Sequence, residues 1–158
     1  HCCNVWGALD GLKVTIQAPC HGSIQNRFYN GWTHGHHVNC SFIFALAGRI
    51  RTTIYNASGT FHDFTMADYG IYATMESIFE RTGGKVVVDS AFRLNEFGFI
   101  IMSSQLDPLE EESLLINREA TSIRQLSEWG MRMIQAQFPM IKDNIQYEDK
   151  GERKKCLD

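Results

Sequence analysis

The sequence has no long apolar run and no excess of positive charge. No stretch approaches the roughly 18 consecutive apolar residues that a membrane-spanning helix requires, and we therefore expect no membrane partner. The N-terminal residues HCCNVW lack the basic segment and apolar core of a secretory signal. The formal net charge is −3 at pH 7, whereas a self-sufficient nucleic-acid-binding protein usually carries a basic excess.

Closely paired cysteines and nucleotide-binding motifs are also absent. The five cysteines contain no C-x-x-C pair, which argues against a cysteine zinc site and indicates reduced thiols in an intracellular protein. No GxGxxG, P-loop or GxSxG motif occurs, so nothing supports a nucleotide cofactor or serine hydrolysis.

The chain has the size and composition of one globular domain. Its 158 residues can bury most of their apolar surface, and 44% are hydrophobic while 21% are charged. The sequence does not begin with methionine, from which we expect an N-terminally truncated domain. We predict that the domain covers residues 1–141 and that residues 142–158 form a polar, charged tail.

β-prone segments dominate the first part of the chain. Residues 4–18 read as two strands around Asp10-Gly11, and residues 19–37 read as a polar loop. Residues 38–54 predict an antiparallel hairpin that turns at Ala47-Gly48. Helical spacing then predicts a helix over residues 62–82 that Gly83 and Gly84 terminate.

Two strands and a long helix follow. Residues 85–89 (KVVVD) and 97–104 (FGFIIMSS) read as central strands buried on both faces, and residues 104–112 read as a solvated loop. A helix is expected from about Glu111 to Phe138, before Pro139. Its core-facing stripe is Ile116, Ala120, Ile123, Gly130, Ile134 and Phe138. The order predicts a mixed sheet with helices packed on it.

Three acidic residues allow both an ordinary and a chemical interpretation. Asp10-Gly11 is typical of a two-residue hairpin turn, but Asp10 is also a candidate carboxylate at the end of a core strand. Asp89 ends a buried strand, where ligand sites of α/β sheets collect, although strand-to-loop aspartates are common. Glu128 either forms a ladder of ion pairs with Arg124 and Arg132 or joins the two aspartates.

If these three acids converge, divalent cations must offset their mutual repulsion. Hard oxygen ligands suit Mg²⁺ or Mn²⁺, and a pair of such ions fits phosphodiester chemistry. Glu119 is an alternative acid on the same predicted helix.

Five motifs occur in a recognisable order: GALDG, YNGWTHGHHVNCSFIF, NASGTFHD, KVVVDSAF and NREATSIRQLSEWGM. In this order they resemble the DDE superfamily endonuclease domain of PIF/Harbinger-type transposases, a family with the RNase H-like fold. The resemblance implies that Asp10, Asp89 and Glu128 are the catalytic, metal-binding triad. It also implies two Mg²⁺ or Mn²⁺ ions, DNA as the substrate, a nuclear location and a separate DNA-binding partner protein, with an oligomer left open.

Two functions remain open at this stage. The chain is either a metal-dependent DNA endonuclease or transposase core, or a domesticated or decayed relative that binds DNA or protein without cleaving. Asp63 is either the N-cap of the following helix or an accessory active-site acid. His34, His36 and His37 read as a solvated loop rather than a zinc site. Candidate DNA contacts are Arg27, Tyr29, Trp32, His37, Arg124 and Arg132.

Overall fold

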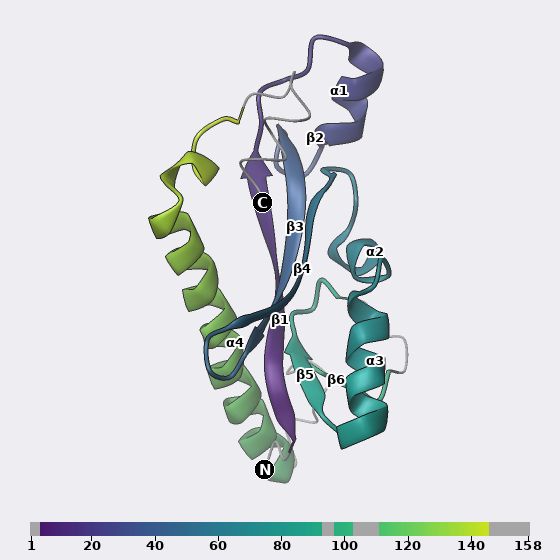
Figure 1. Cartoon of the computed structure of the whole chain (residues 1–158), viewed down its shortest axis with the longest axis vertical. Coiled ribbons are helices and arrows are strands. Elements are labelled where there is room, and N and C mark those ends of the chain that lie inside the picture. Colours follow the sequence, from purple (N-terminus) through teal and green to yellow (C-terminus); the bar gives the residue numbers. More distant parts are fainter. Residues whose placement is uncertain (1–3, 93–96, 103–110, 146–158) are drawn as a thin grey trace.

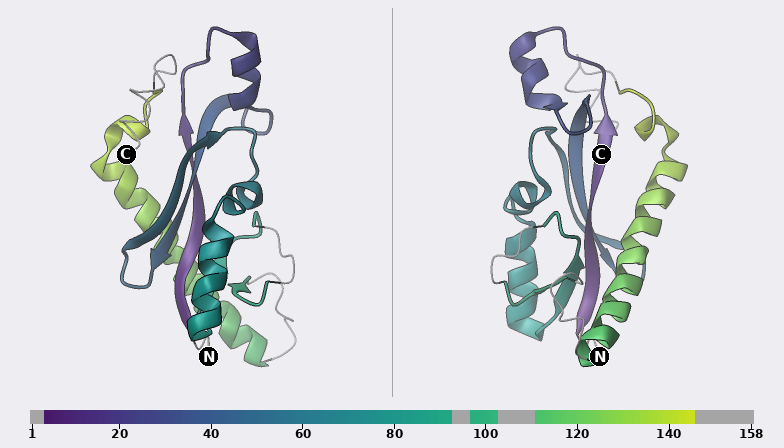
Figure 2. Two further views of the ribbon diagram at one scale, coloured as in Figure 1. Left: turned by 45° about the vertical axis from the view of Figure 1, so that its right-hand side comes forward. Right: turned by 180° about the vertical axis from the view of Figure 1, so that it is seen from behind.

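The computed structural model describes residues 4–92, 97–102 and 111–145. These residues form a mixed β-sheet with helices on both faces (Figure 1). Helix α4 (Glu111–Gln137) crosses one face, while α2 (Asp63–Ala67) and α3 (Ile71–Thr82) cover the other (Figure 2). This architecture confirms the predicted α/β class and is consistent with an RNase H-like domain.

The sheet combines antiparallel and parallel pairing. Its six strands are β1 (Val5–Thr15), β2 (Tyr29–Asn30), β3 (Gly35–Ala45), β4 (Ile50–Ser58), β5 (Lys85–Val88) and β6 (Ile100–Ile101). The strand order is β2-β3-β1-β5-β6, and β4 also pairs with β3. Strand β3 is antiparallel to its three neighbours, whereas β5 is parallel to both β1 and β6.

The predicted turn at Asp10-Gly11 is wrong, because β1 is one continuous strand of 11 residues. Asp10 pairs with Phe42 and Gly11 with Ser41 in the antiparallel ladder with β3. The Asp-Gly signal is local, whereas the long ladder with β3 keeps the backbone extended through this dipeptide.

Two further predictions need correction. Residues 19–37 are not one loop: they contain helix α1 (Gly22–Phe28), strand β2 and the beginning of β3. Phe28 anchors α1 because its side chain is buried in the core. The helix predicted over residues 62–82 is broken into α2 and α3, since Gly70 adopts a positive φ of 122° that a continuous helix cannot accommodate.

The strand predicted over residues 97–104 is also wrong in extent, because β6 covers only Ile100–Ile101, is half-buried and lies at the end of the strand order. Several other boundaries agree with the sequence. The hairpin of β3 and β4 turns as expected, with Gly48 at φ 74°. Helix α3 ends at Gly83, which adopts the left-handed conformation typical of a helix C-terminus. Helix α4 has nearly the predicted bounds, and β5 is buried as expected. The predicted loop at residues 104–112 lies mostly outside the described residues.

The core lies on both faces of the sheet. One cluster packs α2 and α3 against the sheet through Leu9, Ile43 and Met75, among others. Another packs α4 against the opposite face, where Met131 joins Val14. Phe138 departs from the predicted stripe, since its side chain is 52% exposed.

Three smaller findings bear on the earlier expectations. Ile145, in the segment predicted as a tail, is buried and pairs with Ile16. Cys40 is a buried free thiol, and burial raises its pKa to about 11. No helix within the described residues is long and apolar enough to cross a membrane.

Candidate active site

The parallel register of β1 and β5 brings two aspartates to adjacent positions. Leu9 pairs with Val88, which is the last residue of β5, and these two residues precede Asp10 and Asp89. Because parallel strands advance together, the two aspartates lie side by side where the ladder ends. This is the carboxyl end of a short parallel pair, the edge at which α/β sheets commonly bind ligands.

Asp10 is partly buried in an acidic environment. Its Oδ1 accepts a hydrogen bond from the Gly11 N–H at 2.8 Å, and its Oδ2 accepts one from the Ser127 hydroxyl at 3.5 Å. Burial raises the pKa of Asp10, and the charges of Asp89, Glu128 and Asp63 raise it further, against the lowering effect of the Gly11 hydrogen bond. Asp10 therefore binds a proton or a cation more readily than an isolated aspartate does.

Asp89 is fixed by the backbone turn that follows β5. Its Oδ1 accepts hydrogen bonds from the Ser90 N–H at 2.6 Å and from the Ser90 hydroxyl at 3.2 Å. The side chain is 47% exposed, so its other oxygen remains available to solvent or a ligand.

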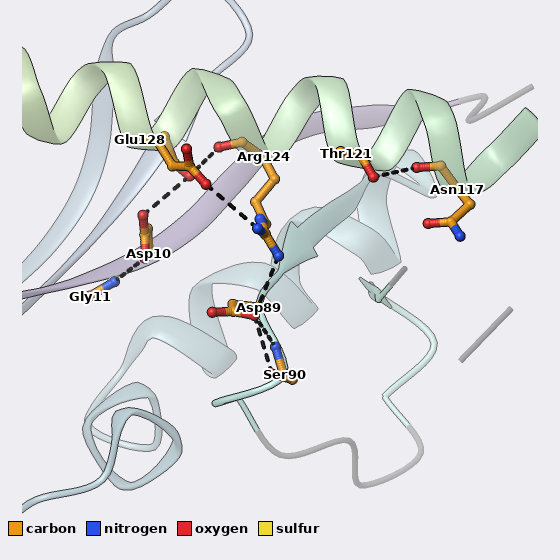
Figure 3. A network of polar contacts seen from close by, with 9 residues as sticks. Asp10, Gly11, Asp89, Ser90, Asn117, Thr121, Arg124 and Glu128 are labelled. Atoms are coloured by element: carbon orange, nitrogen blue, oxygen red, sulfur yellow. Dashed lines mark hydrogen bonds and ion pairs between the residues drawn. The ribbon is translucent and has the colours of Figure 1, made fainter. Parts of the chain in front are cut away.

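Arg124 of α4 connects Asp89 with Glu128 (Figure 3). Its Nη1 lies 3.5 Å from Asp89 Oδ1, and its Nη2 lies 3.5 Å from Glu128 Oε1. The predicted i,i+4 pair therefore exists, and it is part of the acidic cluster rather than separate from it. This bridge is not visible in the sequence, because Arg124 meets Asp89 only through the tertiary fold.

Glu128 is the acid of α4 that faces the two aspartates. Figure 3 shows its carboxylate on the same side of the helix as Arg124 and turned toward that guanidinium. Its charge also contributes to the raised pKa of Asp10. Glu119 lies nine residues earlier, which at 100° per residue is the opposite side of the helix, and its side chain is exposed. Ser127 was also missed, although its full burial marks the side of α4 that touches β1.

Asp63 is not the N-cap of α2. His62 occupies that position and makes no side-chain capping bond, while Asp63 begins the helix. The Asp63 carboxylate lies against Gly11: a Cβ built on Gly11 would be 2.9 Å from Asp63 Oδ1. Burial raises the pKa of Asp63, while the positive charge of Lys13 lowers it. Asp63 is thus a fourth acid beside the cluster.

The cluster has the right donor chemistry for a hard divalent cation, but its oxygens are not gathered into a ligand set. Within residues 4–92, 97–102 and 111–145, no three His, Cys, Asp or Glu side chains are close enough to hold one ion. The Arg124 guanidinium lies between two of the carboxylates and supplies the positive charge. Burial is the main cause of the raised pKa of Asp10, and the charges of Asp89, Glu128 and Asp63 add to it. A cation beside these acids would relieve their mutual repulsion.

The predicted DNA-contacting residues have different environments. Arg27, Tyr29, Trp32 and Arg132 are exposed, and the Trp32 side chain is 90% exposed. His36 and His37 belong to β3 rather than to a loop, so the loop prediction is wrong for them. Both ring nitrogens of His37 are buried without a hydrogen-bond partner, and burial lowers its pKa, which disfavours a charged contact with phosphate.

The chain is thus an α/β domain with a candidate cation-dependent active site. That site is an acidic cluster at the carboxyl end of a parallel strand pair, and the long helix α4 faces it. The chain belongs to the DDE superfamily endonuclease family, whose sequence profile matches residues 9–157. An endonuclease domain of this family implies DNA as the substrate, and the family generally uses divalent metal ions. No curated protein and no solved structure matches the chain significantly.

Proposed function

We propose that this domain is the catalytic core of a metal-dependent DNA endonuclease or transposase of the PIF/Harbinger type that acts in the nucleus. The observation that carries the proposal is the strand register that makes Asp10 and Asp89 neighbours, with Glu128 facing them from α4. Family membership supports a nuclease function, and the order of the five sequence motifs supports the subtype.

Asp10, Asp89 and Glu128 are the residues that would hold Mg²⁺ or Mn²⁺. Two bound cations would supply the Lewis acidity that activates a hydroxide or 3′-hydroxyl nucleophile and stabilises the leaving oxygen. Asp10 would be deprotonated on binding, which the raised pKa of its carboxyl makes pH-dependent.

Neighbouring side chains would prepare this site. The Ser127 hydroxyl donates a hydrogen bond to the Arg124 carbonyl oxygen at 2.7 Å, and it makes a longer contact of 3.5 Å with Asp10 Oδ2. The Arg124 guanidinium pairs with both Asp89 and Glu128 and offsets part of their negative charge. With a cation bound to these acids, it would be free to bind a phosphate oxygen of DNA. Asp63 is an accessory acid that could hold a proton next to Gly11.

The test is nicking of supercoiled plasmid in Mn²⁺ by the chain and by two variants, Asp89→Ala and Glu128→Gln. We expect each variant to lose at least 100-fold in rate, as when one ligand or charge-stabilising group of an active site is removed. Glu119→Gln is the matched control, because it removes the same charge from the opposite side of α4. Equal nicking by the chain and by Asp89→Ala would mean that a contaminating nuclease acts and that the proposal fails.

A second candidate is a non-cleaving binding module derived from such a transposase. It is favoured by the bridge of Arg124 across Asp89 and Glu128, which offsets part of the charge of these two acids without metal. DNA binding without nicking, at any Mn²⁺ or Mg²⁺ concentration, would favour this candidate over the enzyme.

A further inference from the structure

A groove lined by arginines lies at the end of β5 opposite the acidic cluster. It has a volume of about 700 Å³ between the turn of the β3–β4 hairpin, the beginning of β1 and the end of α3. Arg49 and Arg51 contribute from the hairpin, and Arg81 contributes from α3. Trp6 and Ile78 supply apolar lining between them.

A second hollow of about 490 Å³ continues this groove along α3. The two share Arg51, Ile78 and Arg81, and the second adds the small polar side chains of Thr74 and Ser77. We call the two hollows together the arginine groove. Its length along a helix suits an extended ligand rather than a compact one.

The charge of the arginine groove is unbalanced. Its lining includes three arginines and no acidic residue, and none of the three arginines forms an ion pair within the described residues. The acids of α3, Glu76 and Glu80, line neither hollow. Three exposed cations held together in a chain of net charge −3 repel one another, and a bound anion would relieve this repulsion.

We propose that the arginine groove binds the phosphate backbone of DNA as a site separate from the active site. Guanidinium groups match phosphate oxygens in bidentate geometry, and their spread over two hollows fits successive phosphates. The groove and the acids lie at opposite ends of β5, whose four residues span roughly 13 Å. DNA held there adds affinity at a distance from carboxylates that repel it.

The test is fluorescence anisotropy with a labelled 20-base-pair duplex of arbitrary sequence, in EDTA and over a range of salt concentrations. The groove variant is Arg51→Gln combined with Arg81→Gln. Its matched control is Arg118→Gln combined with Lys142→Gln, which removes the same charge from exposed positions outside the groove. We expect the chain to bind with micromolar affinity, as non-specific binders typically do. We expect the groove variant to bind about tenfold more weakly, with a salt slope smaller by about 1.8.

Several outcomes would overturn this inference. One is undetectable DNA binding by the unaltered chain. Another is a groove variant whose dissociation constant is within twofold of that of the unaltered chain and whose salt slope is unchanged. The third is a control variant that loses as much affinity as the groove variant. Thermal melting checks folding, since surface substitutions of this kind change stability little. A polyglutamate peptide that competes as well as DNA would assign the groove to acidic protein segments instead.

The binding measurement does not depend on cleavage. It is made in EDTA, where no divalent cation is available for cleavage. Groove-dependent binding by an unaltered chain that does not nick plasmid in Mn²⁺ would therefore refute the proposed enzyme function and leave the groove intact. Nicking by a chain whose DNA binding does not depend on the groove would refute the groove alone.

Discussion

Replacing Arg124 by glutamine should strengthen metal binding and weaken cleavage. The guanidinium lies 3.5 Å from both Asp89 and Glu128, and the three side chains are 38%, 47% and 44% exposed. Ion pairs this exposed are worth about 0.2–1 kcal/mol each. A cation that displaces Arg124 must therefore replace contacts worth on the order of 1 kcal/mol. Because Arg124→Gln lacks these contacts, we expect it to bind Mn²⁺ roughly fivefold more tightly than the unaltered chain does.

Two measurements separate the roles of this residue. Electron paramagnetic resonance counts free Mn²⁺ during a titration and gives the dissociation constant without any DNA. Plasmid nicking at saturating Mn²⁺ then reports the later role, in which the freed guanidinium would contact a phosphate oxygen. We expect nicking by Arg124→Gln to fall at least tenfold, because a charge-assisted hydrogen bond is lost.

Arg118→Gln is the matched control, since Arg118 is exposed on the same helix and lines a different hollow. Arg124→Lys should give an intermediate affinity, because an ammonium group lacks the planar fork that reaches two carboxylates. Unchanged or weaker Mn²⁺ binding by Arg124→Gln would refute competition between the guanidinium and the metal. Equal Mn²⁺ binding by Asp89→Ala would mean that the ion binds elsewhere.

Three further predictions concern stability and the accessory acid. The pKa of Asp10 is raised from 3.8 by folding, so the folded chain holds this proton more tightly than the unfolded chain does. The free energy of unfolding should therefore fall as the pH rises from about 3.8 through the raised pKa of the folded state. Asp10→Asn should therefore raise the melting temperature by roughly 2–4 °C at pH 7 in EDTA, with no gain near pH 3. Gly130→Ala should cost about 1–3 kcal/mol in urea unfolding, because its Cβ would overlap the Phe44 ring. Gly11→Ala should displace Asp63 and reduce nicking several-fold, whereas unchanged nicking would argue against an accessory role.

Patterns that depend on neighbouring residues alone predicted much of the fold. The end of α3 at Gly83 and the hairpin turn at Gly48 follow from a conformation that glycine adopts easily. The bounds of α4 follow from a long apolar period that Pro139 ends. The burial of β5 follows from three consecutive valines with no alternation.

Features that depend on pairing between distant segments were not predictable in this way. Asp10-Gly11 has a strong local preference for a turn, yet its antiparallel ladder with β3 holds it in a strand. Arg124 satisfies the simple i,i+4 pattern with Glu128, but its contact with Asp89 spans 35 residues and two elements. For the same reason the nearness of Asp63 to Gly11 could not be inferred from sequence.

The position of the acidic cluster depends on a mismatch in strand length. Strand β1 has 11 residues and β5 has four, so the parallel ladder ends at Leu9 and Val88 while β1 continues beside β3. Asp10 therefore lies beside an open edge of β1 without any turn in the chain, because β5, the parallel neighbour of β1, has ended at Val88. A carboxylate inside a strand is held more rigidly than one in a loop, which suits a group that must meet Asp89 and Glu128 across separate elements. If β5 were longer by two residues, Asp89 would move along β1 by about 7 Å and the two aspartates would no longer be neighbours.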